Sequence, residues 1–325
     1  MQSQKKRSDP IIKTLRLLRE PLRLKQTPLR TLRLHRASAV KTKQMNSEQY
    51  DNIIQPRKSL LDLRIKELIR YYDLLVLFVK RDIVVTYKQT ILGPLWFFVQ
   101  PILTTLIFVV VFGNIAGIST DDIPQPLFYM AGIVIWNFFA DCFTKTADTF
   151  TANAQVFGKV YFPRLITPLS IVISNGLKFL IQFGLFLGLY FYFLLVGTPM
   201  EPNWTLALLP FLIIMMGLFG LGFGLIFSSL TTKYKDLKFL IQFGVQLGMY
   251  ATPVIYPMSE IPEKYHIYMA ANPFSHILEG FKYMFFGEGV ISMAGLIYSF
   301  TFMVVLLFVG TIIFNRTEKT FMDTV

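Results

Sequence analysis

The sequence predicts an all-α membrane protein, and two observations lead to this fold class. The 325-residue chain is 53% hydrophobic and only 16% charged, whereas charged residues make up roughly a quarter of a soluble domain. Six segments lack Asp, Glu, Lys and Arg, and each reaches the ~18 residues that indicate a membrane span. They are 89–120, 123–140, 179–200, 202–232, 239–259 and 289–315. A soluble core helix would carry a charged face, so we expect six transmembrane helices.

Most of the net charge of +12 lies in the first 44 residues, which hold 13 Lys/Arg and 2 Asp/Glu. The basicity therefore belongs to a leader and does not indicate nucleic acid as a partner. Three interpretations remain open: a disordered arm attracted to anionic lipid, an Arg-rich targeting peptide, or translated sequence upstream of a start at Met45. We expect three regions: the leader (1–44), an interfacial helix region (45–91) and a six-span domain (92–325).

Residues 57–88 predict an amphipathic helix. Apolar residues recur every three or four positions from Leu61 to Ile83, while Lys66, Arg70 and Asp73 lie on the opposite face. Such a helix lies on a membrane surface and does not cross it. The alternative is a solvated helix packed on a separate domain.

The charged loops predict the orientation, because short loops rich in Lys and Arg stay cytoplasmic. The second span is expected to begin at about Leu127, and the others are expected at about 92–117, 166–196, 204–231, 238–257 and 293–315. With a cytoplasmic N-terminus, the inner loops contain Lys159, Arg164, Lys233, Lys235, Lys238, Arg316 and Lys319, and the outer loops are net acidic. We therefore expect a multi-pass membrane protein with both termini in the cytoplasm.

Small residues recur in several spans. "KFLIQFG" occurs at 178–184 and at 238–244, and each copy continues to a second glycine four residues on, Gly188 and Gly248. The fourth span adds Gly220 and Gly224. Small residues at this spacing let helices approach closely, so we expect them to mediate helix packing.

The sequence shows no sign of bond chemistry. It has no G-x-x-x-x-G-K-[ST] phosphate-binding loop, so any ATP and Mg must be bound by another chain. It has no G-x-S-x-G nucleophile motif, and its single cysteine, Cys142, cannot form a disulfide within the chain. We predict no catalytic residue, no metal site and no cofactor in this chain.

Charged residues inside the apolar region are the remaining candidates. Asp141, Lys145 and Asp148 share one helix face, and Lys178 lies at a comparable depth on the third span. Ionisable groups in a span face a partner or an aqueous cavity. Two interpretations stay open: a polar lining at the inner mouth of a pathway, or mutual ion pairing near the interface.

Four phrases resemble, in order and spacing, the membrane subunits of ABC transporters that export O-antigen and teichoic acid. They are "RDIVVTYKQTILGPLW" (81–96), "KVYFPRLITPLS" (159–170), "TTKYKDLKFLIQFGVQLGMYATPVIYP" (231–257) and "NPFSHILEGFKYMFFGEG" (272–289). The resemblance covers the chain from about Arg57 to its C-terminus.

The resemblance implies a homodimer of six-span subunits with two copies of a separate ATP-binding subunit. It also implies a short cytosolic coupling loop that docks on the ATPase, with Lys159 and Arg164 as charged flanks and aromatic residues as anchors. The loop residues are Gly158, Lys159, Val160, Tyr161, Phe162, Pro163 and Arg164. Residues 258–290 would form short re-entrant gate helices on the outer side. The gate residues are Pro253, Tyr256, Pro257, Asn272, Pro273 and Glu279.

The expected function is that of a permease subunit that moves a lipid-linked polysaccharide across the cytoplasmic membrane. A drug or lipid exporter of the same superfamily is the first alternative, because it would share the coupling loop. An ion-coupled carrier that depends on Asp141 is the second. The sequence does not identify the glycan.

Overall fold

The computed structural model describes residues 65–88, 92–200, 202–289 and 291–324. The chain divides into two units, Met1–Pro56 and Arg57–Val325, and every described residue belongs to the second. The predicted leader (1–44), the start at Met45 and the beginning of the surface helix (57–64) lie outside the described residues. Within the described ranges all regular structure is helical, which confirms the predicted all-α class.

Five helical stretches are long and apolar enough to cross a membrane. They match the first, second, third, fourth and sixth predicted spans, and the chain is therefore a multi-pass membrane protein. The stretches are η2 (Gly93–Leu95) with α5 (Trp96–Phe108) and the π-helix η3 (Val109–Ile115), then α6 (Gln125–Ala147), α9 (Ile166–Val196), η4 (Trp204–Leu208) with α10 (Leu209–Lys233), and α14 (Met293–Thr324).

The remaining predicted span, 238–257, is only partly helical. α11 (Leu237–Tyr250) has 14 residues, or about 21 Å at 1.5 Å per residue, which is less than the ~30 Å hydrocarbon thickness of a bilayer. Pro253 cannot donate a backbone hydrogen bond, so the helix ends before it. Residues 251–256 continue as turns, and Thr252 to Ile255 are buried. The count of six spans stays a prediction.

α6 is the central helix, and glycines of α10 let the two helices approach closely. A Cβ atom added at Gly220 would lie 2.5 Å from Cβ of Cys142, and one at Gly217 would lie 2.9 Å from the Phe138 ring. A Cβ atom added at Gly224 would likewise lie too close to the Thr146 side chain. The predicted small-residue packing at Gly220 and Gly224 is therefore present.

The glycines of the repeated phrase behave differently. No atom of the chain lies within 4 Å of an added Cβ at Gly184, Gly188 or Gly244, whereas one at Gly248 would meet the Trp136 ring at 3.3 Å. Helix packing through the first copy, predicted from the sequence, is therefore absent within the described chain. The two copies differ only at the second glycine, because Gly248 of α11 packs against Trp136 of α6 and Gly188 of α9 has no such neighbour.

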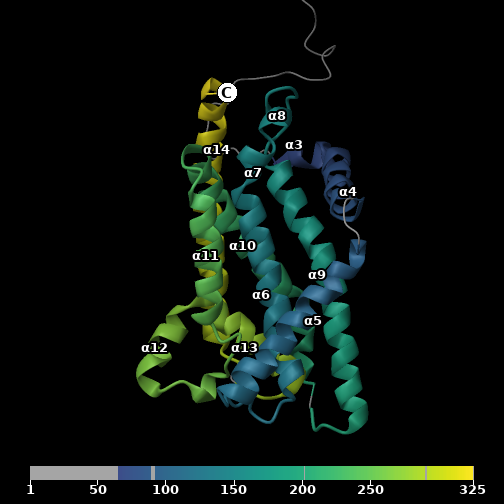
Figure 1. The fold of residues 1–325 in the computed structure, drawn as a ribbon. Helices are drawn as coiled ribbons and strands as arrows, with labels where there is room; N and C mark the ends of the chain where they lie inside the picture. Colours follow the sequence, from purple (N-terminus) through teal and green to yellow (C-terminus); the bar gives the residue numbers. More distant parts are fainter. Residues whose placement is uncertain (1–64, 89–91, 201, 290, 325) are drawn as a thin grey trace, which may run out of the picture. The chain divides into compact units, whose positions relative to one another are not determined.

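One end of the bundle holds the short helices α7 (Thr149–Ala152) and α8 (Ala154–Phe157), and we call it the α8 end (Figure 1). α3 (Ile65–Arg70), α4 (Tyr72–Lys88) and the last turns of α14 lie at this end too. A satellite cluster of buried side chains joins them. Its members are Phe78, Phe150, Phe157, Phe162, Ile166, Leu221, Leu225 and Phe314.

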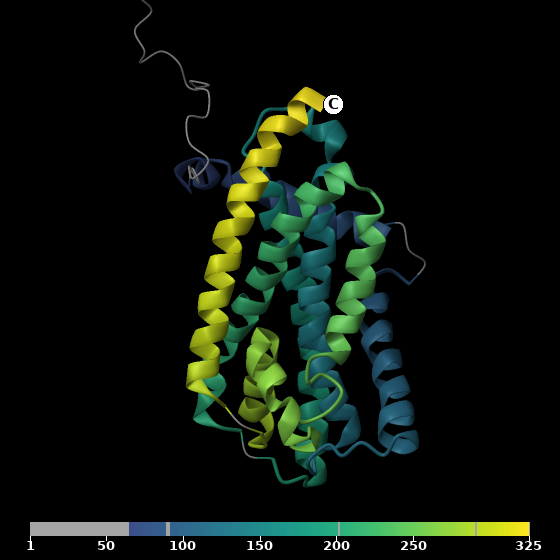
Figure 2. The same cartoon turned by 90° about the vertical axis from the view of Figure 1, so that its left-hand side faces the viewer.

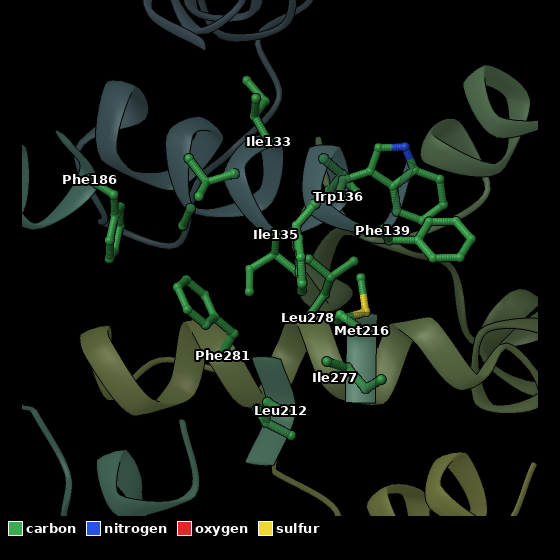
Figure 3. Close-up of a cluster of buried hydrophobic side chains, with 14 of the residues drawn as sticks. Ile133, Ile135, Trp136, Phe139, Phe186, Leu212, Met216, Ile277, Leu278 and Phe281 are labelled. Carbon is green, nitrogen blue, oxygen red and sulfur yellow. The ribbon is translucent and has the colours of Figure 1, made fainter. Parts of the chain in front are cut away.

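The opposite end, called the α12 end, holds α12 (Glu263–Ala271) and α13 (Pro273–Phe286) (Figures 1 and 2). α13 is buried along most of its length. Figure 3 shows its side chains Ile277, Leu278 and Phe281 directed toward residues of α6, α9 and α10. α13 is thus part of the main core, while α12 has no buried residue.

Candidate functional site

The predicted coupling loop follows two single-turn helices at the α8 end. α6 ends at Ala147, α7 and α8 follow with Asn153 between them, and α9 begins at Ile166. Asn153 Nδ2 donates to Thr149 O at 3.0 Å, and Ile166 N donates to Pro163 O at 3.0 Å. These bonds close the turns on both sides of Gly158 to Arg164, so the loop has a defined conformation.

Phe162 and Arg164 face the interior of this chain. Phe162 is only 4% exposed, and its ring makes an edge contact with Phe78 of α4 at 5.5 Å. The Arg164 guanidinium donates to Glu318 O of α14 at 3.0 Å, lies 4.0 Å from the Glu318 carboxylate and stacks over Phe157. These two side chains join the loop to the interfacial helix and to the C-terminal helix.

Lys159, Val160 and Tyr161 form the exposed tip of the loop. Tyr161 is 58% exposed and Val160 59%. The sequence analysis expected Arg164 at the surface as a charged flank and both aromatic rings as anchors for a partner. In the described chain Phe162 and Arg164 are instead buried against α4 and α14. The contact of the loop with an ATPase stays a prediction.

The four predicted inner residues lie near one another at the α8 end. Asp141 forms an ion pair with Lys178 at 2.5 Å, and Asp148 pairs with Lys238 of α11. Lys145 donates to Asn175 Oδ1 at 2.8 Å. Lys145, Asp148 and Lys178 also line a cavity of about 530 Å³. The sequence left open whether these residues form ion pairs or line a polar cavity. The described chain contains both, because the ion pairs lie beside the cavity.

The predicted gate residues lie together at the α12 end. Asn272 Nδ2 donates to Ala251 O and to Thr252 Oγ1, each at 3.1 Å, so this side chain links the start of α13 to the end of α11. Its Oδ1 accepts from Phe274 N and caps α13, and Pro273 occupies the first helical position. The Tyr256 hydroxyl donates to Tyr250 O at 2.9 Å. Pro257 immediately precedes η5 (Met258–Glu260) as its N-cap residue.

Lys282 is the central residue of this group, and it was not among the gate residues predicted from the sequence. Its ammonium donates to Pro253 O at 2.6 Å, contacts Tyr256 O at 3.4 Å and lies 4.0 Å from the Phe128 ring centre. Glu279 is 3.6 Å away on the same helix. A Glu–Lys pair at i, i+3 inside an otherwise apolar helix was the signal that could have revealed it.

Burial sets the electrostatics of this pair. Glu279 is 6% exposed and Lys282 is 3% exposed. Burial raises the pKa of Glu279 above its ordinary value and lowers that of Lys282, and each charge opposes part of the other's shift. Lys282 also satisfies the carbonyl groups that lack a helical partner after α11 ends, which offsets the cost of burying the pair.

This arrangement defines a class of multi-pass helical membrane proteins with a folded loop at one end and a buried helical segment at the other. The chain belongs to the ABC-2 type transporter family, whose model matches residues 73–286. The family resemblance predicted from the four sequence phrases is thereby confirmed.

Curated relatives support the same assignment. The O-antigen export system permease protein RfbA of Klebsiella pneumoniae is 29% identical over 81% of this chain and 99% of its own length. The protein of the same name from Myxococcus xanthus is 26% identical over 80% of this chain and 98% of its own length. The polysialic acid transport protein KpsM of Escherichia coli is 23% identical, over 74% and 91% respectively.

Proposed function

We propose that this chain is the permease subunit of an ATP-driven exporter that moves a lipid-linked surface polysaccharide across the bacterial cytoplasmic membrane. The match along nearly the whole length of an O-antigen export permease carries this proposal. The similarity to a polysialic acid transport protein supports a polysaccharide as the substrate class. The chain itself transmits force and performs no bond chemistry.

ATP and Mg are bound by a partner subunit, present in two copies. The sequence contains no G-x-x-x-x-G-K-[ST] motif, which supports ATP binding by a separate subunit. The exposed loop tip of Lys159, Val160 and Tyr161 is the contact with the ATPase. A tyrosine beside an aliphatic side chain suits such a contact, because aromatic residues dominate the energy of protein interfaces.

Two copies of the chain form the transport unit. We assign the contact between the copies to α11, whose Phe239, Leu240 and Phe243 side chains are each more than half exposed. In the dimer this face meets the second copy, and α11 with residues 251–257 acts as the fifth of six spans. The α8 end, which carries Lys159 and Lys235, faces the cytoplasm, and so do both termini.

The transport cycle couples the two ends of the bundle. ATP binding closes the partner subunits and displaces the loop tip, and the contacts of Phe162 and Arg164 transmit that displacement to α4 and α14. Residues 251–257 with α12 and α13 form the outer gate. The polysaccharide passes along the interface between the two copies.

The two alternative functions differ from the proposed one in the substrate or in the energy source for transport. A drug or lipid exporter would share the loop, and glycosyltransferase genes beside this one would argue against it. An ion-coupled carrier needs a carboxylate free to exchange a proton, whereas Asp141 is already paired with Lys178. Transport that survives depletion of ATP would revive that second alternative.

A deletion strain tests the proposed function. Loss of the gene should abolish the surface polysaccharide and cause its lipid-linked form to accumulate inside the cell, and a plasmid copy should restore export. Purification of the tagged chain from native membranes should also recover an ATPase with Walker motifs. A deletion strain with normal surface polysaccharide would refute the proposal.

A further inference from the structure

The cavity at the α8 end has the size and the lining of a ligand site. Its volume of about 530 Å³ lies within the roughly 300–1,000 Å³ of small-molecule pockets. Its walls come from α4, the start of α5, the end of α6, α7, α8 and the first turns of α9. The polar lining residues are Arg81, Asp82, Lys145, Asp148, Asn153, Ser174, Asn175 and Lys178.

The carboxylates around this cavity each have a cationic partner. Asp82 pairs with Arg81 at 2.8 Å, Asp148 pairs with Lys238, and Asp141 pairs with the lining residue Lys178. These acids are therefore neutralised. A ligand that enters the cavity meets no unpaired negative charge from them.

Lys145 is different from the other lining cations. Its hydrogen-bond acceptor is the neutral amide oxygen of Asn175, and no carboxylate of the described residues lies within 4.0 Å of it. Asn175 is 3% exposed, and its Nδ2 donates to Ile171 O, so its amide oxygen is held toward Lys145. The cavity thus presents an ammonium group that is held by a neutral amide and has no direct ion-pair partner among the described residues.

Further donors surround this ammonium group. Asn153 and Asn175 each use one amide N–H on a carbonyl of their own segment, and an amide nitrogen carries two. The Arg81 guanidinium also lies on the wall, 3.4 Å from Asn153 Oδ1. A lysine with amide and guanidinium donors nearby matches the acceptor oxygens of a phosphate group.

The location narrows the ligand class further. One wall is α4, the amphipathic helix at the α8 end, and others are the ends of the membrane-spanning helices α5, α6 and α9. In the proposed orientation this is the depth of the inner-leaflet headgroups. Basic pockets between helices at this depth bind the headgroups of anionic lipids.

We propose that this cavity binds the phosphate-bearing headgroup of an anionic lipid from the inner leaflet, with Lys145 as the principal cation. The inference rests on the orientation given under the proposed function. Two sources share this chemistry: a membrane phospholipid, and the diphosphate of a polyprenyl carrier.

Equilibrium binding to the purified full-length chain tests the site. The probes are radiolabelled farnesyl diphosphate and dihexanoyl phosphatidylglycerol, each measured in detergent by scintillation proximity, with dihexanoyl phosphatidylcholine as the zwitterionic control. The assay contains neither ATPase nor polysaccharide. A failure here would therefore refute the site alone, and a normal surface polysaccharide in the deletion strain would refute the transport function alone.

Lys145→Ala should weaken binding of the favoured probe by about tenfold or more, because it removes a charge-assisted contact. Lys145→Arg should retain most of the affinity. Lys235→Ala is the matched control, since it removes an exposed cation from the same end outside the cavity, and it should bind like the wild type. Variants are compared only if their elution volume and melting temperature match the wild type.

The pattern of binding identifies the source. Saturable binding of both probes with mutual competition indicates a general anionic headgroup site, and binding of only one probe names that lipid class. No saturable binding of either probe to the wild type would overturn the inference. An equal loss of affinity in Lys145→Ala and Lys235→Ala would overturn it too.

Discussion

Phe162 and Tyr161 are adjacent aromatic residues with opposite surroundings. Phe162 fills the satellite cluster between α4, α8 and α14, whereas the Tyr161 side chain is mostly exposed. Phe162→Ala should therefore lower the free energy of unfolding by about 3 kcal/mol, the typical cost of a large-to-small change in a core. Urea or thermal unfolding of the purified chain measures this, and a value near zero would contradict the packing described.

Tyr161→Ala should leave that stability within about 0.5 kcal/mol, as for most surface substitutions. If the loop tip is the ATPase contact, the same variant should weaken binding of the partner by about 2 kcal/mol, or roughly thirtyfold. Co-purification and titration of the partner ATPase provide the measurement. Tyr268→Ala on α12 is the matched control, since it removes an exposed tyrosine at the opposite end, and it should bind the partner normally.

The Glu279–Lys282 pair gives a second residue-level prediction. Lys282→Met leaves a buried carboxylate without its cation and two carbonyl groups without a donor, so stability should fall by about 3–5 kcal/mol. Adding Glu279→Gln should recover part of that loss, with a coupling energy of about 0.5–3 kcal/mol. Melting curves of the two single variants and the double variant measure it, and strictly additive losses would show that the charges do not interact.

Sequence reasoning placed the loop and the gate phrase but could not assign directions to single side chains. Arg164 turns inward and contacts Glu318, which is 154 positions away in the chain. No local pattern contains that information. The position of Asn272 before Pro273 was enough to predict a helix cap. Its hydrogen bond to Ala251 could not be predicted, because that bond depends on where α11 ends.

At the scale of elements, the α6–α10 contact is the most sharply testable. Gly220→Ala would bring its Cβ within 2.5 Å of Cys142 Cβ, so the helices must separate. We expect a loss of about 1–3 kcal/mol from overpacking. Gly184→Ala is the matched control on α9, where nothing lies within 4 Å, and it should be neutral or stabilised by up to ~1 kcal/mol.

Fluorescence-detected size exclusion after a heating series compares these two glycine variants in membranes solubilised under identical conditions. Equal melting temperatures for Gly220→Ala and the wild type would contradict the close approach of α6 and α10. A strongly destabilised Gly184→Ala would instead indicate that a second copy or a lipid occupies that face of α9.

The helices were predictable to the extent that they follow from local composition. Apolar runs without charges predicted α5, α6, α9, α10 and α14, because length and hydropathy alone set a membrane span. The same rule failed to show that α11 stops at Tyr250, because residues 251–257 are as apolar as a helix. Pro253 ends the helix because it lacks a backbone N–H, and the buried position of residues 252–255 shows that the non-helical segment is packed inside the protein.

At the scale of the whole molecule, the orientation can be tested with single cysteines. The native Cys142 is buried, so background labelling by a membrane-impermeant maleimide should be low. Ile267→Cys on α12 is expected to react in intact spheroplasts, whereas Val160→Cys on the loop tip should react only after permeabilisation. Both native side chains are more than half exposed, so a difference in labelling reflects the side of the membrane and not burial within the protein. The reverse pattern would invert the proposed topology.

Sequence composition was sufficient for the membrane class, and four phrases were sufficient for the family. Neither could reveal the cavity beside α4, since its lining comes from segments as far apart as Arg81 and Lys178. The helix faces that line the cavity show no distinctive pattern in the sequence. They form a site only because the ends of α6 and α9 pack beside α4. Binding sites of this kind depend on packing, which single-sequence patterns do not encode.

The link between α13 and the end of α11 has a consequence for water. Lys282 supplies the donor for the buried carbonyl group of Pro253, and Asn272 donates to the exposed carbonyl group of Ala251. Separating the two segments without replacement partners costs several kcal/mol for each polar group left bare. Water molecules are the replacement at hand. Movement of α13 away from α11 and hydration of this end of the protein therefore occur as one event, and a dry intermediate is unfavourable.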